Sequence, residues 1–154
     1  MAQSIKEVVA LREAKQRKLD SVFANIAKEI STLSHCVRAK VGSVLVKNGN
    51  IISMGYNGMP SGMENCCEDT LENGNLLTKS EVLHAESNAL LKAAKMGLST
   101  DGSTMYCTLS PCKDCAKLIL QSGIKRVVYL ELFSRDEGSV EFLSNFIKVE
   151  KHVV

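Results

Sequence analysis

The fold is decided by residues 102–129, which read GSTMYCTLSPCKDCAKLILQSGIKRVVY. Residues 104–109 are rich in β-forming side chains and predict a strand. Residues 112–121 have helical spacing, and the nearly continuous apolar run at 126–133 predicts a second strand that is covered on both faces. The stretch therefore reads as a β-α-β unit, whose two strands lie parallel.

The predicted helix in this unit carries signals at both ends. Ser110 and Pro111 suit its N-cap and first position, and Gly123 suits the position just after its end. Pro111 also directly precedes Cys112, and Cys115 follows three residues later. We therefore expect both thiols in the first helical turn, facing the same way.

Upstream of this unit, the sequence predicts another helix and a hairpin. Residues 84–95, HAESNALLKAAK, favour a helix, and Gly97 is a natural stop. Residues 41–46 and 51–55 are β-rich runs around the turn at 47–50, which contains Asn-Gly, the strongest short hairpin signal.

The two ends of the chain complete the pattern. Residues 4–33 predict a long amphipathic helix that begins with a capping box of Ser4 and Glu7. Residues 137–146 predict a helix and residues 147–153 a last strand. The whole order predicts an α/β fold, a three-layer α/β/α sandwich with a mixed five-stranded sheet, and one domain over all 154 residues.

Residues 48–63 have a different character from their surroundings. They contain no charged side chain, but they hold four of the ten glycines and Pro60, one of only two prolines. Such a stretch is a shaped loop rather than a regular element. We expect it to form a wall facing a ligand, and a plain surface loop is the alternative.

Composition sets limits on the class of protein. A hydrophobic fraction of 45% and a charged fraction of 23% exclude a disordered chain and a coiled coil. The formal net charge of +2 lacks the basic footprint of a nucleic-acid surface and favours a small substrate. Neither a secretory signal nor a membrane span is visible, so we expect a cytoplasmic protein with no membrane partner.

Two motifs carry candidate chemistry, and each stands at the start of a predicted helix. Reduced cytosolic thiols make metal binding or catalysis a better interpretation of the cysteines than disulfides. His84, Cys112 and Cys115 would give one Zn²⁺ ion three protein ligands and leave a fourth position for water, the pattern of a catalytic zinc. Glu86 can reach that water without being a ligand, and can accept and return a proton. H-x-E followed by P-C-x-x-C is the signature of zinc nucleobase deaminases.

The chain resembles the cytidine deaminase superfamily, and within it the deoxycytidylate (dCMP) deaminases of phages and bacteria. The resemblance rests on VGSVLVKNGNIISMGYNGMPSGMENCCED, EVLHAESNALLKAAK and the stretch quoted first. The loop GYNGMPSG followed by a cysteine pair is the more specific part. The resemblance implies zinc-dependent hydrolysis of dCMP to dUMP and ammonia, which supplies dUMP for thymidylate synthesis.

The resemblance also implies roles for individual residues. Glu86 is the catalytic residue, which moves a proton to the ring N3 and then to the leaving ammonia. The backbone of Ala85 meets the pyrimidine O2, and Asn57 touches sugar and base. Phe133 is a candidate for stacking on the base, with an ordinary core aromatic as the alternative.

A monophosphate needs a positive pocket. Arg38 and Ser110 are the candidates, the second because we expect it at a helix N-terminus. Lys40 and Lys113 are weaker candidates. A solvated surface side chain is the alternative for Arg38.

The remaining cysteines are open to more than one interpretation. Cys107 alternates within a strand and suits the core. Cys36, Cys66 and Cys67 could hold a second, structural zinc, as in some phage relatives, but those relatives use an additional His that is absent here. We therefore expect one catalytic zinc and three mainly buried thiols near the nucleotide loop.

The resemblance further implies assembly and regulation. Many similar deaminases are homohexamers that dCTP activates and dTTP inhibits, and Mg²⁺ can accompany such a nucleotide. The effector sites involve the helix that carries H-x-E, on which Lys92 and Lys95 lie.

Three other interpretations stay open. The first is another deaminase of the superfamily, acting on tRNA adenosine, guanine or cytosine. The second is a non-catalytic domain stabilised by zinc, against which Glu86 argues. The third is a thiol–disulfide protein that uses Cys112 and Cys115, which would hold no tightly bound zinc.

Overall fold

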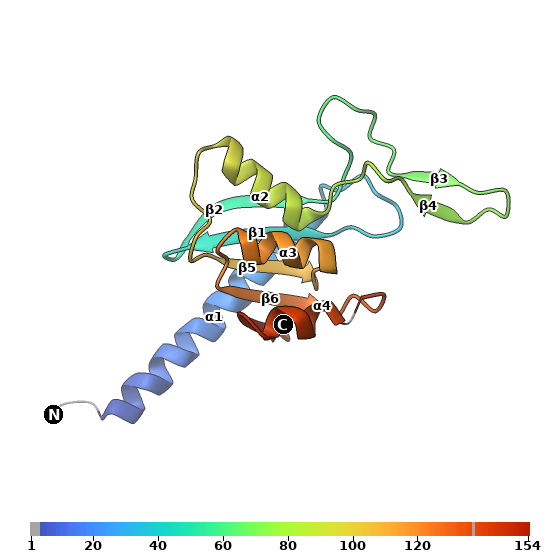
Figure 1. The fold of residues 1–154 in the computed structure, drawn as a ribbon. Coiled ribbons are helices and arrows are strands. Elements are labelled where there is room, and N and C mark those ends of the chain that lie inside the picture. The colour runs from blue at the N-terminus through green and yellow to red at the C-terminus, as the bar shows by residue number, and fades with distance from the viewer. Residues whose placement is uncertain (1–3, 137) are drawn as a thin grey trace.

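The computed structural model describes residues 4–136 and 138–154 (Figure 1). Its elements are α1 (Ile5–Ser31), β1 (Gly42–Lys47), β2 (Asn50–Tyr56), β3 (Glu68–Thr70), β4 (Leu76–Thr78), α2 (Ala85–Lys95), β5 (Thr104–Leu109), α3 (Lys113–Gln121), β6 (Arg126–Glu131), α4 (Gly138–Ser144) and β7 (Lys148–Lys151). Apart from β3 and β4, this is the order that the sequence predicts.

Five strands form one mixed sheet in the order β2-β1-β5-β6-β7. β1 pairs antiparallel with β2 and β5, whereas β5, β6 and β7 run parallel. The first hairpin turns at Asn48 and Gly49, whose φ angles of 51° and 76° are those that an Asn-Gly turn adopts. The parallel pairs are connected through α3 and α4, as parallel neighbours require. The predicted mixed five-stranded sheet is confirmed.

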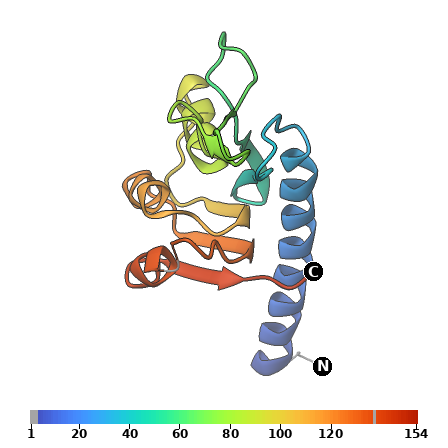
Figure 2. The ribbon, with the colours of Figure 1, turned by 90° about the vertical axis from the view of Figure 1, so that its right-hand side faces the viewer.

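Helices cover both faces of this sheet (Figure 2). α1 packs on one face, where Phe23, Val44 and Tyr106 belong to one buried core. On the other face, α2, α3 and α4 enclose a second core that includes Leu45 and Ile119. The molecule is therefore the three-layer α/β/α sandwich that the sequence predicts.

Two glycines allow helices to approach the sheet closely. A Cβ atom at Gly42 would collide with the carbonyl oxygen of Ala27 in α1, and one at Gly55 with that of Ala85 in α2. Gly55 therefore brings the end of β2 against the first turn of α2, the turn that carries the H-x-E motif.

α1 is anchored at one end and exposed at the other. Its predicted capping box is present, with Glu7 N–H donating to Ser4 Oγ at 3.3 Å and Ser4 N–H to Glu7 Oε2 at 2.9 Å. In its second half, buried Asp20 accepts bonds from the Arg126 guanidinium at 2.7 and 2.9 Å and from the Tyr106 hydroxyl at 2.7 Å. The first half extends beyond the sheet (Figure 1). Neither α1 nor any other helix in the described ranges is apolar over the length that a membrane crossing needs.

Several boundaries differ from the prediction. Ser110 is not the N-cap of α3, because the helix begins later and Cys112 takes that place with extended backbone angles. The last helix and strand are shorter than predicted, and Glu137, the predicted start of that helix, lies outside the described residues. β3 and β4 were not predicted, because strands of three residues show no periodicity.

Candidate active site

Three potential metal ligands meet at the starts of two helices. His84 is the N-cap of α2, Cys112 is the N-cap of α3, and Cys115 lies in the first turn of α3. The Nδ1 atom of His84 lies 3.4 Å from the Sγ atom of each cysteine. Ligand atoms around a tetrahedral zinc are about 3.5 to 3.8 Å apart, so the donor set and its spacing fit a zinc ion. Among the described residues, only this trio brings three or more potential ligand side chains close enough together to share a metal ion.

The electrostatics of this trio, taken without a metal ion, favour one ionised thiol. A hydrogen bond with Cys115, together with one from His84, lowers the pKa of Cys112 to about 4. The hydrogen bond with Cys112 and burial raise the pKa of Cys115, and the hydrogen bond with Cys112 raises the pKa of His84. One thiol therefore ionises readily, and the thiolate is the form of cysteine that binds metal.

Glu86 lies in the first turn of α2, two residues after His84, and is only 4% exposed. Burial raises the pKa of its carboxyl group above the ordinary value, and the charge of nearby His84 opposes that effect. A buried carboxyl group with a raised pKa is suited to accept a proton and return it during a reaction.

A cavity of about 440 Å³ opens beside these groups. Glu86, His84 and Cys112 form one part of its lining. The substrate-site residues predicted from the sequence also line it, namely Arg38, Asn57, Ala85, Ser110 and Phe133. The fold thus gathers residues from separate parts of the chain around one space of a size suited to a small molecule.

The amide group of Asn57 is engaged with the backbone at the cavity wall. Its Oδ1 atom accepts from the N–H of Val41 at 2.8 Å, and its Nδ2 atom donates to the carbonyl of Ala39 at 2.9 Å. Because an amide has a further lone pair and a further hydrogen, a substrate contact is still open to it. Asn57 therefore orders the segment before β1 in addition to facing the cavity.

Ser110 and Phe133 form a pair at the opposite wall. The Ser110 hydroxyl does not cap α3; instead it accepts a hydrogen bond from the backbone N–H of Phe133 at 2.8 Å. Ser110 is buried, whereas Phe133 is half-buried and faces the cavity. The hydroxyl thus fixes the aromatic residue after β6, although the sequence suggested for it a role at a helix N-terminus.

Two arginines bring positive charge to the cavity. Arg38 was predicted from the sequence, and Arg135 was not, although both line the cavity. Lys40 and Lys113 are not part of the lining. Arg135 lies just beyond the carboxyl end of β6, where parallel sheets place their ligands, and this position is the signal that could have indicated it.

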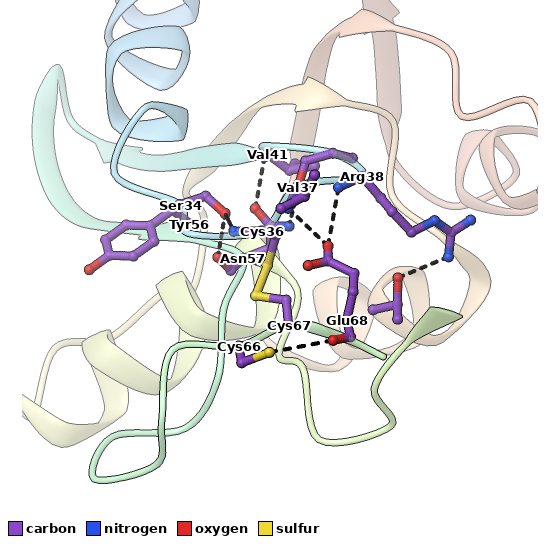
Figure 3. The surroundings of a disulfide bond; sticks show 12 residues. Ser34, Cys36, Val37, Arg38, Val41, Tyr56, Asn57, Cys66, Cys67 and Glu68 are labelled. Atoms are coloured by element: carbon purple, nitrogen blue, oxygen red, sulfur yellow. Dashed lines mark hydrogen bonds between the residues drawn. A yellow bond between two sulfur atoms is a disulfide. The ribbon is translucent and has the colours of Figure 1, made fainter. Parts of the chain in front are cut away.

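The prediction of three free, mainly buried thiols at Cys36, Cys66 and Cys67 is wrong. Cys36 and Cys67 are joined in a disulfide bond with Cα atoms 5.2 Å apart, and Cys66 is an exposed free thiol (Figure 3). The pairing arises because the unpredicted β3–β4 hairpin brings Cys67 against the segment that follows α1. Cys107, in contrast, is a buried core residue, as predicted.

A second cavity of about 680 Å³ lies outside the first, against α2. Its lining includes the glycine-rich loop from Gly55 to Met63 on one side, and Lys92 and Lys95 of α2 on the other. The loop therefore lines this second cavity, and Asn57 lines both cavities.

Comparisons with known proteins agree on one family. The family model for the cytidine and deoxycytidylate deaminase zinc-binding region matches residues 7–131. The chain is 40% identical to the deoxycytidylate deaminase of Enterobacteria phage T4, over 76% of this chain and 80% of that protein. It is 38% identical to the deoxycytidylate deaminase of Saccharomyces cerevisiae, over 82% of this chain and 42% of the yeast protein.

The solved structures extend this likeness to three dimensions. The dCMP deaminase from cyanophage S-TIM5, crystallised in complex with dCMP and dUMP, matches with a TM-score of 0.80 and 45% identity. That match covers 87% of this chain and 96% of the other. With its family motif, fold and His-Cys-Cys trio, the chain belongs to the cytidine and deoxycytidylate deaminase family.

Proposed function

We propose that this protein catalyses the hydrolytic deamination of dCMP, in which dCMP and water give dUMP and ammonia. One observation carries the proposal: the trio of His84, Cys112 and Cys115 stands at a cavity that buried Glu86 and two arginines line. The names of the relatives and the nucleotides in the cyanophage structure support the same substrate.

Within this proposal, Glu86 handles the protons. His84, Cys112 and Cys115 would hold a zinc ion, which would supply Lewis-acid activation of the attacking water. The Glu86 carboxylate accepts one proton of the attacking water and gives it to the pyrimidine N3. It then takes the remaining proton from the oxygen added at C4 and gives it to the amino group, which leaves as ammonia while the C4 carbonyl forms. The burial of Glu86 suits this cycle. It raises the pKa of the carboxyl group, and so brings its proton affinity closer to those of the groups with which it exchanges protons.

The other side chains bind and orient the nucleotide. The backbone of Ala85 contacts the pyrimidine O2, Asn57 contacts the sugar and base, and Phe133 stacks on the base. These assignments agree with their common place in the cavity lining. Ser110 acts by holding Phe133, through the hydrogen bond to the Phe133 backbone.

The 5′-phosphate is assigned to the arginines. A phosphate in a partly enclosed site needs charge-assisted donors, and a guanidinium offers paired donors in a fixed fork. Arg38 and Arg135 are the two such groups in the cavity lining. They distinguish dCMP from deoxycytidine in this proposal.

The second part of the proposal concerns regulation by nucleotides, assembly, metabolic role and cellular location. The cavity between the glycine-rich loop and α2 suits a nucleoside triphosphate, because Lys92 and Lys95 give it positive charge. We assign dCTP as activator and dTTP as inhibitor, with Mg²⁺ accompanying the triphosphate. The proposed assembly is a homohexamer, and the proposed role is to supply dUMP for thymidylate synthesis in the cytoplasm, the host's if the gene belongs to a phage.

The experiment measures ammonia release and zinc content on the same purified protein. We expect about one zinc per chain, and a kcat/KM for dCMP at least about 10-fold above that for deoxycytidine, as loss of a charged contact implies. A tRNA stem-loop and guanine test the other deaminase activities, and added dCTP tests activation. Equal rates on dCMP and deoxycytidine would contradict the substrate assignment, and zinc without any deamination would favour a non-catalytic domain.

A further inference from the structure

We propose that the β3–β4 hairpin is a positioning device for Arg38, acting chiefly through Thr78 and Glu68. The inference rests on the proposed function, because it takes Arg38 as a contact to the substrate phosphate. It assigns a role in substrate recognition to two residues that do not themselves react.

The hairpin is first tied to the neighbourhood of Arg38 by a covalent bond. Cys67 lies immediately before β3, and its disulfide partner Cys36 lies two residues before Arg38 (Figure 3). Both cysteines are at most 2% exposed. The base of the hairpin and the segment carrying Arg38 are therefore held side by side.

Glu68 next fixes the backbone of this segment. One carboxylate oxygen, Oε1, accepts hydrogen bonds from the N–H groups of Val37 at 2.9 Å and Arg38 at 3.1 Å. Glu68 also lines the cavity, where an unengaged carboxylate would repel a phosphate. Its Oε1 atom is instead engaged by two backbone donors, which is the geometry of a supporting residue rather than a substrate contact.

Thr78 then holds the other end of the same arginine. Its Oγ1 atom accepts a hydrogen bond from Nη1 of Arg38 at 3.0 Å. Thr78 is the cross-strand partner of Glu68 at the base of the hairpin. One pair of facing residues therefore holds Arg38 at its backbone and at its guanidinium. Figure 3 shows Glu68 against the backbone of Val37 and Arg38.

The hairpin does not take part in either core of the described chain. Residues 69–78 are exposed, and among the described residues neither core cluster includes a member of β3 or β4. An exposed arginine has many rotamers, and ordering it before the substrate arrives reduces the entropy cost of binding. The hairpin thus contributes to affinity for the phosphate without adding to the core.

The test compares Thr78→Val with Thr78→Ser and Thr70→Val. Thr78→Val removes the acceptor, and we expect it to raise KM for dCMP about three- to tenfold, the value of one hydrogen bond, with kcat unchanged. Thr78→Ser keeps the hydroxyl and should restore KM. Thr70→Val is the matched control, because Thr70 is an exposed threonine of the same hairpin. None of these variants should change kcat/KM for deoxycytidine, which lacks the phosphate.

A parallel pair of variants tests the backbone contact. Glu68→Ala should raise KM for dCMP in the same selective way, and Glu68→Gln, which keeps an acceptor oxygen, should raise it less. If Arg38→Ala raises KM for dCMP at least 10-fold while Thr78→Val and Glu68→Ala leave it unchanged, the hairpin does not position Arg38, although the proposed function stands. If the wild-type protein does not prefer dCMP to deoxycytidine, the proposed function itself fails and this inference with it.

Discussion

The two sides of the cavity are built in different ways. On the metal side, His84, Glu86, Cys112 and Cys115 come from the first turns of α2 and α3. The side that carries Arg38 is called the anion side. There, a loop and the β3–β4 hairpin hold Arg38 through contacts between residues 30 or more positions apart. Both sides depend on contacts between distant parts of the chain, since His84 meets Cys112 and Cys115 across 28 and 31 positions. They differ in what presents the groups: the starts of two helices on the metal side, and a loop supported by a short hairpin on the anion side.

The largest effect should come from breaking the metal side at a ligand. Cys115→Ser removes a thiolate, so we expect zinc affinity to fall by more than the roughly 10- to 100-fold that loss of an outer-shell partner costs, and deamination to fall to background. Metal analysis after dialysis, alongside the activity assay, measures both quantities. Cys66→Ser is the control, because Cys66 is exposed and outside the site. Full zinc and full activity in Cys115→Ser would remove Cys115 from the site.

The next effect separates proton transfer from metal binding on the same side. Glu86→Gln keeps the size of the side chain but cannot take up the proton, so kcat should fall about 10²- to 10⁴-fold. Zinc content should stay at the wild-type level, because Glu86 is not one of the three ligands. Single-turnover and steady-state rates on dCMP check this. An unchanged kcat would show that the proton moves by another route.

The smallest effect should come from loosening the anion side. Cys67→Ser opens the disulfide but leaves the bonds of Glu68 and Thr78 to Arg38 in place, so we expect KM for dCMP to rise about two- to threefold, less than one full hydrogen bond is worth. The kcat value and zinc content should not change. Wild-type protein reduced with dithiothreitol should behave like Cys67→Ser, while reductant should have no effect on Cys67→Ser itself. A large fall in kcat would mean that the two sides are not independent.

Much of the fold and the metal side could be predicted from the sequence. The Asn-Gly turn, the helix stop at Gly97 and the apolar run of β6 each act within a few residues, so their local signals survive in the folded protein. The His84, Cys112 and Cys115 trio could be predicted because His84 stands at the start of one helix and both cysteines stand at the start of another. The exact cap of α3 could not, because Ser110 and Cys112 are both sterically suited to precede a helix.

Less of the anion side could be predicted from the sequence, for a physical reason. The Cys36–Cys67 pairing depends on where a hairpin of two three-residue strands comes to lie, and nothing in so short a pattern encodes that place. Arg135 was missed because a single arginine in a loop gives no periodic signal. The resemblance to dCMP deaminases supplied Arg38 as a candidate, but not the residues that support it.

The Cys36–Cys67 bond also has a consequence for the unfolded chain. It closes a covalent ring across 31 positions, and this ring contains Arg38, the β1–β2 hairpin, the glycine-rich loop and Asn57. Chain-entropy arguments give such a ring roughly 4 kcal/mol of stabilisation, because the denatured ensemble has fewer conformations to lose on folding. The ring therefore limits in advance the disorder of the wall that we propose contacts the nucleotide, whereas His84, Cys112 and Cys115 lie outside the ring and gain no such restriction from it.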